Sequence, residues 1–415
     1  MLISFNHFTY NVFVMAKENK KLVLKRHAFY RCLLWPVVKL IGAMYGFKNK
    51  SHFKIKKGES YLVLSNHQTG LDPIYVMMAF NKILYAVATD TLMSNGTVSK
   101  LLNHCFGVIP KKKGIADYDA NLKMLQVMQE GGSLLLFPEG NRSYAEFQFS
   151  FTKAFPKFLK TIKKPVILFN IHGGTGTNPR FANKPRKGPF YGKIRKVLKY
   201  EDYKDMSDSE LYETISANLK VYDSSSKSNY ESNKRAEYLE RIFFVCPKCG
   251  KTQCLESSGN FIECKECGLK VEYTNNLHLK PNDKGIDIHK MLDWYNYQIR
   301  YIKNLEIGDN LIFADDNVEI YTSHLYEKRK LISKGRLELY KDKMTIGDLT
   351  INMSEVNIAS PTGGRKIVLQ TTSDDYIIVG PERFNPLKYV FMFNKLDTKM
   401  KQNSTDIHYT LEERK

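Results

Sequence analysis

Long apolar runs are missing from the sequence: no stretch of about 18 or more uncharged apolar residues occurs, which argues against a standard membrane-spanning helix. Cysteine is scarce, with seven in 415 residues. This number is too small for a disulfide framework. Acidic residues number 43 against 63 basic ones, which leaves a formal net charge of +20. Such an excess favours an anionic partner, either a nucleic acid or an anionic lipid surface. The hydrophobic fraction of 43% excludes a mainly disordered chain.

Half of the positive excess lies in residues 1–60, which contain twelve Lys or Arg and only two acidic residues. Within them, the apolar segment 28–47 carries two charges and several aromatic residues. An apolar helix with basic flanks suits the headgroup boundary of a membrane, although a buried core helix with solvated lysines would leave the same pattern. Pro36 should kink this helix or split it in two. We expect no secretory signal, since no Lys or Arg precedes the first weak apolar run.

Four of the seven cysteines form two pairs with the spacing C-x2-C-x14-C-x2-C. Gly250 and Gly268 follow the pairs and should supply the positive-φ position just past each turn. Four thiolates fill the tetrahedron of a zinc ion and leave no open position, so the predicted Zn²⁺ site is structural. Disulfides are the alternative, but nothing else in the sequence points to an oxidising compartment. The predicted ligands are Cys246, Cys249, Cys264 and Cys267.

Strands and helices alternate over residues 55–200, which predicts an α/β fold with a mixed or mostly parallel sheet. The expected strands are 61–65, 83–88, 107–109, 133–137 and 166–171, with helices from Asp72 onward and over 117–130. The segment 223–234 is rich in Ser and Asn and reads as a linker or exposed loop.

The tail has a different texture, with short β-type runs separated by turn signals over residues 305–380. A final amphipathic helix is expected over 385–396. About seven strands closed by one helix are typical of a small barrel of the pleckstrin-homology-like kind. The runs expected to form strands are 311–313, 318–321, 336–340, 343–346, 356–358, 366–370 and 376–379.

Two polar motifs follow predicted strands, N-H-Q-T-G-L-D at 66–72 and F-P-E-G-N-R-S at 137–143. Ligands of open α/β sheets bind at the carboxyl ends of the strands, so the two loops would share one cleft if they leave the same edge. In the first loop, Asp72 could fix the tautomer of His67, which could then remove a proton from a hydroxyl. Alternatively, Asp72 only caps a helix and His67 is an ordinary loop histidine.

No Ser or Cys is arranged locally as a nucleophile, so direct attack by a substrate hydroxyl is favoured over an acyl-enzyme. In the second loop, Arg142 beside Gly140 suits a phosphate, because Arg offers a bidentate fork and Gly lets backbone N–H groups approach. An ordinary turn with a surface arginine is the alternative interpretation.

Together, N-H-x-x-x-x-D and, 70 residues later, F-P-E-G-x-R-S resemble the glycerolipid acyltransferase family. Its best-known members are 1-acylglycerol-3-phosphate acyltransferases, which make phosphatidic acid. The resemblance covers roughly residues 25–220. It implies that His67 is the general base and Asp72 its orienting partner. It further implies that the acceptor phosphate is bound by Glu139, Gly140 and Arg142.

Two further blocks resemble the family less closely. The segment 107–113 is similar to the family's G-x-I-P-x-x-R block, with Lys113 where the family has Arg. Lys113 is expected to assist phosphate binding without the bidentate fork. The segment 164–168 is similar to a fourth block, a proline at the head of an apolar strand, and continues into His172, which we expect to be structural.

The resemblance implies acyl transfer from acyl-CoA or an acyl carrier protein to lysophosphatidic acid, without a catalytic metal, because a thioester carbonyl is already activated. Glycerol 3-phosphate or another lysolipid is the alternative acceptor. A zinc-ribbon nucleic-acid-binding protein is the alternative from another class, but residues 246–268 carry no net charge, so no nucleic-acid partner is expected.

The resemblance also implies that the protein lies at the cytoplasmic face of the cell membrane, peripheral or monotopic, on an anionic surface. The predicted organisation has five parts. They are a basic amphipathic membrane-associating region (1–50), the acyltransferase domain (51–222), a linker and helix (223–242), the zinc ribbon (243–275) and a β-rich domain with a C-terminal helix (285–400).

Overall fold

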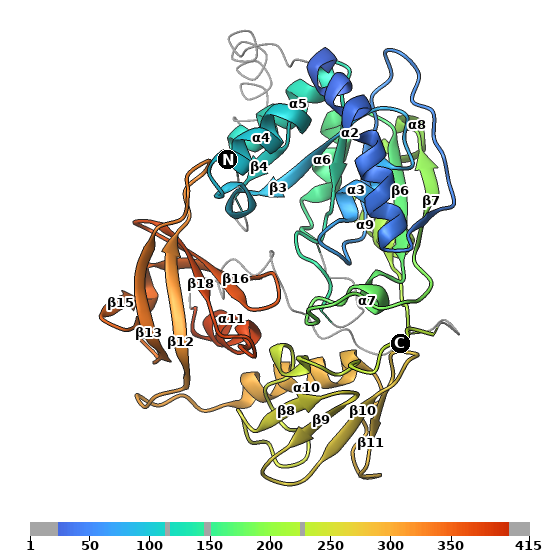
Figure 1. Cartoon of the computed structure of the whole chain (residues 1–415). Helices are drawn as coiled ribbons and strands as arrows, with labels where there is room; N and C mark the ends of the chain where they lie inside the picture. The colour runs from blue at the N-terminus through green and yellow to red at the C-terminus, as the bar shows by residue number, and fades with distance from the viewer. Residues whose placement is uncertain (1–23, 113–116, 145–150, 225–228, 398–415) are drawn as a thin grey trace.

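The computed structural model describes residues 24–112, 117–144, 151–224 and 229–397. The first 23 residues of the basic region and Lys113 lie outside the described residues. Figure 1 shows an α/β domain built from the N-terminal half, a small separate sheet, and a β-rich domain beside both.

The α/β domain is built on a mixed seven-stranded sheet with the order β1-β7-β6-β2-β5-β3-β4. All neighbouring pairs are parallel except β6 and β7, so the predicted fold class is confirmed. The central strands are short apolar runs because both faces of the sheet are covered. The strands are β1 (Lys48–Asn49), β2 (Leu62–Ser65), β3 (Leu84–Thr89), β4 (Ile109–Lys111), β5 (Ser133–Leu136), β6 (Val166–His172) and β7 (Tyr191–Leu198).

Helices cover both faces of this sheet. Leu62 and Leu64 of β2 pack into a core with α5, α6 and α9, whereas Val63 packs on the opposite face with α3. This alternation follows from the two-residue period of a strand. The helices are α2 (Leu24–Met44), α3 (Asp72–Met77), α4 (Thr97–Phe106), α5 (Tyr118–Gln129), α6 (Phe155–Ile162), α7 (Gly174–Thr177), α8 (Tyr200–Tyr203) and α9 (Asp208–Leu219), with a 3₁₀ turn, η1, at Asp90–Met93.

Helix α2 runs without a break through Pro36, so of the two expected effects, a kink or a split, the split does not occur. A proline removes one backbone donor, and neighbouring turns can still hold the helix together. On its inner side, Arg31 donates to the carbonyl of Phe80 at 2.6 Å. On its outer side, apolar residues three or four positions apart are exposed: Phe29, Leu33, Val37, Leu40 and Met44. Within the described ranges, no helix is long and apolar enough to cross a membrane.

The cysteine-rich segment forms a four-stranded antiparallel sheet with the order β11-β10-β9-β8. Helix α10 (Met291–Asn304) packs against the chain that leads into the first cysteine pair. The indole of Trp294 stacks on Phe243 with ring centroids 4.3 Å apart and donates to the carbonyl of Val245 at 2.8 Å. The strands are β8 (Leu255–Ser258), β9 (Phe261–Cys264), β10 (Lys270–Tyr273) and β11 (Leu279–Pro281).

The β-rich domain contains seven antiparallel strands and a final helix, as predicted. Two details differ: Phe313, the end of the run 311–313, and the run 318–321 belong to one strand, β12, with a register shift between them, and β15 was not predicted. A bulge interrupts an apolar pattern without ending the strand. The elements are β12 (Phe313–Thr322), β13 (Leu331–Leu339), β14 (Lys343–Ile346), β15 (Leu349–Asn352), β16 (Val356–Thr362), β17 (Lys366–Thr371), β18 (Asp375–Val379) and α11 (Pro386–Leu396).

One continuous core joins the cysteine-rich segment to the β-rich domain. It contains side chains from β9, β10, α10, the strands β12 to β18 and α11. It also contains Tyr144 and Phe181 of the α/β part of the chain. The two C-terminal modules are therefore packed as one body, and this body reaches residues next to the F-P-E-G-N-R-S loop.

Candidate active site

The two polar loops converge as expected, because their strands are neighbours. Strands β2 and β5 pair in parallel, with Leu64 opposite Leu136, so both following loops leave the same edge of the sheet. The loops also bond to one another: the N–H of Ser143 donates to the carbonyl of His67 at 2.8 Å. In return, the N–H of His67 donates to Oε1 of Glu139 at 3.3 Å.

His67 and Asp72 form a hydrogen-bonded pair in which Nδ1 of the imidazole lies 2.8 Å from Oδ2 of the carboxylate. Asp72 is fully buried and does not cap helix α3, whose N-cap is Leu71. Its carboxylate turns back to the loop and accepts from the N–H groups of Gln68 and Thr69 at 2.6 and 2.9 Å. The hydroxyl of Thr69 supplies a further bond at 2.6 Å. These donors hold the carboxylate in place against the imidazole.

The surroundings of His67 favour the neutral imidazole. Burial lowers the pKa of His67, and the positive charges of Arg142 and Arg180 lower it further, while the hydrogen bond and charge of Asp72 act in the opposite direction. The ring stacks on Phe137 with centroids 4.2 Å apart, and 20% of the side chain is exposed. With Nδ1–H assigned to the bond with Asp72, Nε2 carries a lone pair, and no group among the described residues hydrogen-bonds it. A histidine in this state can accept a proton.

Arg142 lies beside this pair. A Cβ placed on Gly70 would lie 3.5 Å from Nη1 of Arg142, so the guanidinium borders the His67 loop at a position without a side chain. Burial lowers the pKa of Arg142, and the negative charge of Asp72 partly offsets this. Gly140 adopts a φ of 63°, the left-handed conformation that glycine accepts without strain. A buried cation attracts a bound anion more strongly than an exposed one does, because water screens the interaction less.

The structure describes some of the predicted phosphate-binding residues and not others. Glu139 is buried and bonds to the backbone of His67, and its direct role toward a phosphate stays a prediction. Lys113 is outside the described residues. His172, expected to be structural, stacks on Tyr191 at 4.7 Å between ring centroids, and burial together with nearby lysines lowers its pKa to about 4.

Asp223 is a supporting residue that the sequence did not reveal. It was assigned to the polar linker, but it is buried and accepts from the side-chain amide of Gln68 at 3.1 Å and from the N–H of Gly173 at 2.8 Å. Gln68 in turn accepts from the N–H of Gly174 at 2.8 Å. The segment after Asp223 is polar, so no local pattern distinguishes this aspartate from a linker residue. It connects the His67 loop to the end of β6.

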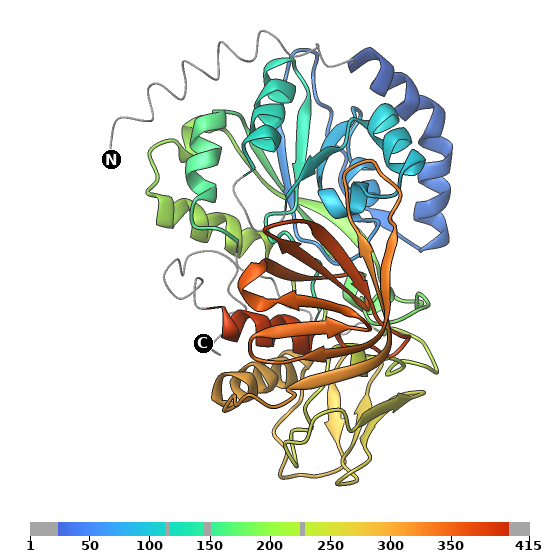
Figure 2. The same cartoon turned by 90° about the vertical axis from the view of Figure 1, so that its left-hand side faces the viewer.

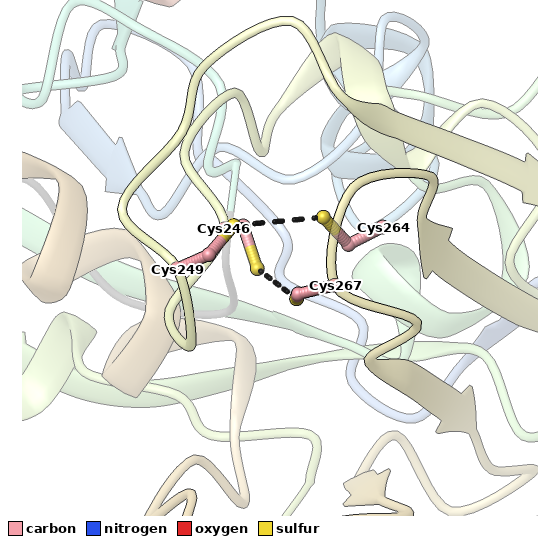
Figure 3. A group of neighbouring side chains, drawn as sticks. All are labelled: Cys246, Cys249, Cys264 and Cys267. Atoms are coloured by element: carbon pink, nitrogen blue, oxygen red, sulfur yellow. Dashed lines mark hydrogen bonds between the residues drawn. The ribbon is translucent and has the colours of Figure 1, made fainter.

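The four predicted cysteine ligands come together in space, as Figure 3 shows. Their Sγ atoms all lie within 4.8 Å of one another, with separations of 3.6 Å between Cys246 and Cys267 and 3.8 Å between Cys249 and Cys264. Ligands at about 2.3 Å in a zinc tetrahedron lie about 3.8 Å apart, whereas disulfide sulfurs lie about 2.05 Å apart. The donor set and its spacing therefore fit a metal site.

Each cysteine pair is closed by a glycine, as predicted. Gly250 and Gly268 adopt φ values of 69° and 70°, and their N–H groups donate to the carbonyls of Cys246 and Cys264 at 2.9 and 3.0 Å. These two turns aim the thiols at one point.

Comparisons with known proteins bear on the stretch that contains the two polar loops. Residues 47–168 match the sequence profile of the family described as Acyltransferase, and this stretch includes both polar loops. This match agrees with the resemblance drawn from the two motifs. A similar solved structure is that of the 1-acyl-sn-glycerophosphate (LPA) acyltransferase PlsC from Thermotoga maritima, with 17% sequence identity and a TM-score of 0.40 over 52% of this chain and 86% of that one. Comparison with curated proteins gave no match.

Proposed function

We propose that this protein transfers a fatty acyl group from an acyl thioester to the free hydroxyl of 1-acylglycerol 3-phosphate, giving phosphatidic acid. The observation that carries the proposal is the pair of His67 and Asp72, with Nε2 available and Arg142 on the neighbouring loop, inside the stretch that matches the acyltransferase profile. The pair supports proton removal, and the arginine supports an anionic acceptor.

In this reaction one proton moves from the acceptor hydroxyl to His67 and then from His67 to the leaving thiolate. Nε2 of His67 takes the proton of the acceptor hydroxyl while its oxygen attacks the thioester carbonyl, and Asp72 stabilises the imidazolium that forms. The tetrahedral intermediate then collapses, its C–S bond breaks, and the imidazolium returns the proton to the leaving thiolate. The ester and a free thiol are the products, and no acyl-enzyme is required.

The acceptor phosphate lies on Arg142 in this proposal, with the left-handed turn at Gly140 letting backbone N–H groups approach it. Glu139 supports the site through its bond to the backbone of His67. Lys113 assists as a point charge. This arrangement favours an acceptor that carries a phosphate close to its free hydroxyl.

Helix α2 holds the protein on the membrane in this proposal. The helix lies on the outside of the α/β domain, as Figure 2 shows in blue. The apolar side chains of its outer side are exposed. Helix α4 is near it, since Tyr30 bonds to His104 at 3.3 Å, and adds the exposed side chains of Val98 and Leu101. Apolar side chains with basic neighbours suit the cytoplasmic, anionic leaflet, where a lysolipid would be presented.

The four cysteines hold one Zn²⁺ in this proposal. All four positions of the tetrahedron are taken by thiolates, so the ion stabilises the fold and takes no part in acyl transfer. The continuous core gives it a role beyond its own segment, because the same core includes Tyr144 beside the second loop.

An assay of the purified protein tests the proposal. Lysophosphatidic acid and glycerol 3-phosphate are each supplied with acyl-CoA and with acyl carrier protein, and the ester product is quantified. We expect transfer to lysophosphatidic acid, and none with the His67→Ala protein. Preferential transfer to glycerol 3-phosphate would change the acceptor but keep the mechanism. Absence of transfer to every phosphate-bearing acceptor would overturn the proposal.

A further inference from the structure

Arg180 connects the second polar loop to the β-rich domain. Its side chain is buried, with 6% exposed, and lies in the loop between α7 and β7. Nη1 donates to the carbonyl of Arg142 at 2.7 Å. Nε donates to the carbonyl of Gly363 at 2.6 Å, in the turn between β16 and β17, and Nη2 donates to the carbonyl of Pro361 at 3.0 Å, near the end of β16. One guanidinium therefore spans two segments that are more than 200 residues apart.

The three acceptors named above are informative because they are backbone carbonyls; Nη1 also donates to Oδ1 of Asn141, in the same loop, at 3.5 Å. Bonds to main-chain oxygens fix the positions of the two loops themselves, and the planar guanidinium donates in fixed directions. The guanidinium also lies over the ring of Tyr144, 3.7 Å from its centroid. Tyr144 follows the F-P-E-G-N-R-S motif directly and belongs to the core of the C-terminal body. The loop is thus held from both its main chain and its flanking side chain.

This attachment bears directly on the geometry of the site. The carbonyl that Arg180 holds belongs to Arg142, whose own guanidinium borders Gly70 in the first loop. The next residue, Ser143, bonds to the carbonyl of His67. A shift of the held carbonyl would therefore move both the phosphate-facing cation and the contact with His67.

We propose that Arg180 is a positioning residue that ties the F-P-E-G-N-R-S loop to the β16–β17 turn, so that the C-terminal β-rich domain completes the acceptor site. The structural tie stands on geometry alone, and its effect on acceptor binding rests on the proposed function. The β-rich domain thereby supports the active site through Arg180 rather than forming a separate appendage.

A second arginine provides a matched control. Arg329 lies at the end of the β12–β13 hairpin, which reaches across to the α/β domain in Figure 2 (orange). It donates to Oγ of Ser94 at 3.0 Å and to the carbonyl of Thr91 at 2.8 Å. It joins the same two domains as Arg180, but its partners belong to neither polar loop. Loss of Arg329 therefore weakens the attachment of the domains without releasing the F-P-E-G-N-R-S loop.

The experiment compares Arg180→Met with Arg329→Met in the full chain. For Arg180→Met we expect the KM for lysophosphatidic acid to rise about tenfold, the factor that corresponds to losing one hydrogen bond of ordinary strength, with the donor KM unchanged. Amide hydrogen exchange should accelerate at Gly140 and Ser143. The N–H of Gly140 donates to the carbonyl of Phe137 within the loop, and the N–H of Ser143 donates to the carbonyl of His67 in the other loop. Arg329→Met should change neither quantity, and Arg180→Lys should restore only part of the exchange protection.

A second pair of variants approaches the contact from the other side. A Cβ on Gly364 would lie 2.9 Å from the carbonyl oxygen of residue 180, so Gly364→Ala should push the turn away. Gly308 has no atom within 4 Å of its Cβ position, so Gly308→Ala is the control. We expect faster exchange at Ser143 for the first variant alone.

The outcomes separate this inference from the proposed function. Exchange at Gly140 and Ser143 that matches the wild type in both Arg180→Met and Gly364→Ala would overturn it, whether or not the protein transfers acyl groups. Equal effects of Arg180→Met and Arg329→Met on the loop would also overturn it, because domain attachment in general would then be sufficient. Absence of acyl transfer by the wild type counts against the proposed function, while the exchange data still decide whether Arg180 holds the loop.

Discussion

The cysteine cluster and the His67 site are assembled in opposite ways. Each half of the cluster is one short turn, closed by Gly250 or Gly268 through a bond to the first cysteine of the pair. The His67 site combines loops that follow β2 and β5, and its supports come from positions as distant as Asp223 and Arg180. A site made of local turns is recognisable from spacing alone, whereas a site made at a sheet edge also depends on the whole fold.

The two sites are nevertheless mechanically connected. The core around the cysteine cluster continues through the β-rich domain to Tyr144 and Phe181. We therefore expect substitutions that disrupt the cysteine cluster to alter the F-P-E-G-N-R-S loop as well. Substitution of His67 should leave the cluster intact.

The largest effect should come from His67→Ala, which removes the base while the cluster stays whole. Loss of a general base typically lowers the rate by about 10²–10⁴-fold. Steady-state kinetics of the purified protein measures this, with His52→Ala, an exposed histidine of the same domain, as the control. A folded His67→Ala protein with most of the wild-type kcat would contradict the mechanism.

Removal of the metal is the next test, because it should act on stability first. We expect metal analysis to find one zinc per chain in the reduced protein, and Cys246→Ser to abolish it and to lower the thermal midpoint. Cys254→Ser is a matched control, since its Sγ lies 3.5 Å from that of Cys264 but outside the group of four.

The connection through the core predicts a specific consequence of zinc loss. The KM for the acceptor should rise more than kcat falls, because the loop beside Tyr144 loosens while His67 and Asp72 keep their local bonds. Far less than one zinc per chain in the wild type would refute the site. Zinc loss with complete loss of kcat would instead show that catalysis depends on the cluster.

Arg142→Ala should act mainly on acceptor binding. We expect the KM for lysophosphatidic acid to rise about 10–100-fold, the range for losing a hydrogen bond to a charged group, with little change in the donor KM. Lys113→Ala should act in the same direction but more weakly, since lysine offers no bidentate fork. A change confined to the donor KM would mean that Arg142 binds the donor's phosphates.

The pH profile should show the smallest but most direct sign of the charges around His67. Burial and the charges of Arg142 and Arg180 lower the pKa of His67. The acid limb of kcat/KM should therefore lie below pH 6.5, the ordinary pKa of a histidine side chain. Asp72→Asn removes a charge that raises this pKa, so the limb should move to lower pH while the plateau falls. Arg142→Ala removes a charge that lowers it, so the limb should move to higher pH. A limb that stays in place in both variants would contradict this assignment.

Sequence patterns were sufficient for several elements of the fold and failed at others for physical reasons. The strands β2 and β5 were predicted because a short apolar run buried on both faces has few alternatives. The alternative that Asp72 only caps a helix does not hold, because its carboxylate is engaged by the loop that precedes the helix. Pro36 does not split α2, because the helix continues past the missing donor.

The sequence by itself determined the residue types and spacings on which the proposed chemistry depends: the His67–Asp72 pair, the arginine of the second loop, and the four cysteines. These depend on short stretches of chain, where spacing and backbone conformation set the geometry. Only the tertiary structure decided that Asp223 is buried behind Gln68 and that Arg180 joins Arg142 to the β16–β17 turn. Such contacts join segments 38 to 183 residues apart, and no local pattern encodes them, because a buried polar side chain is defined by the partners that the fold brings to it.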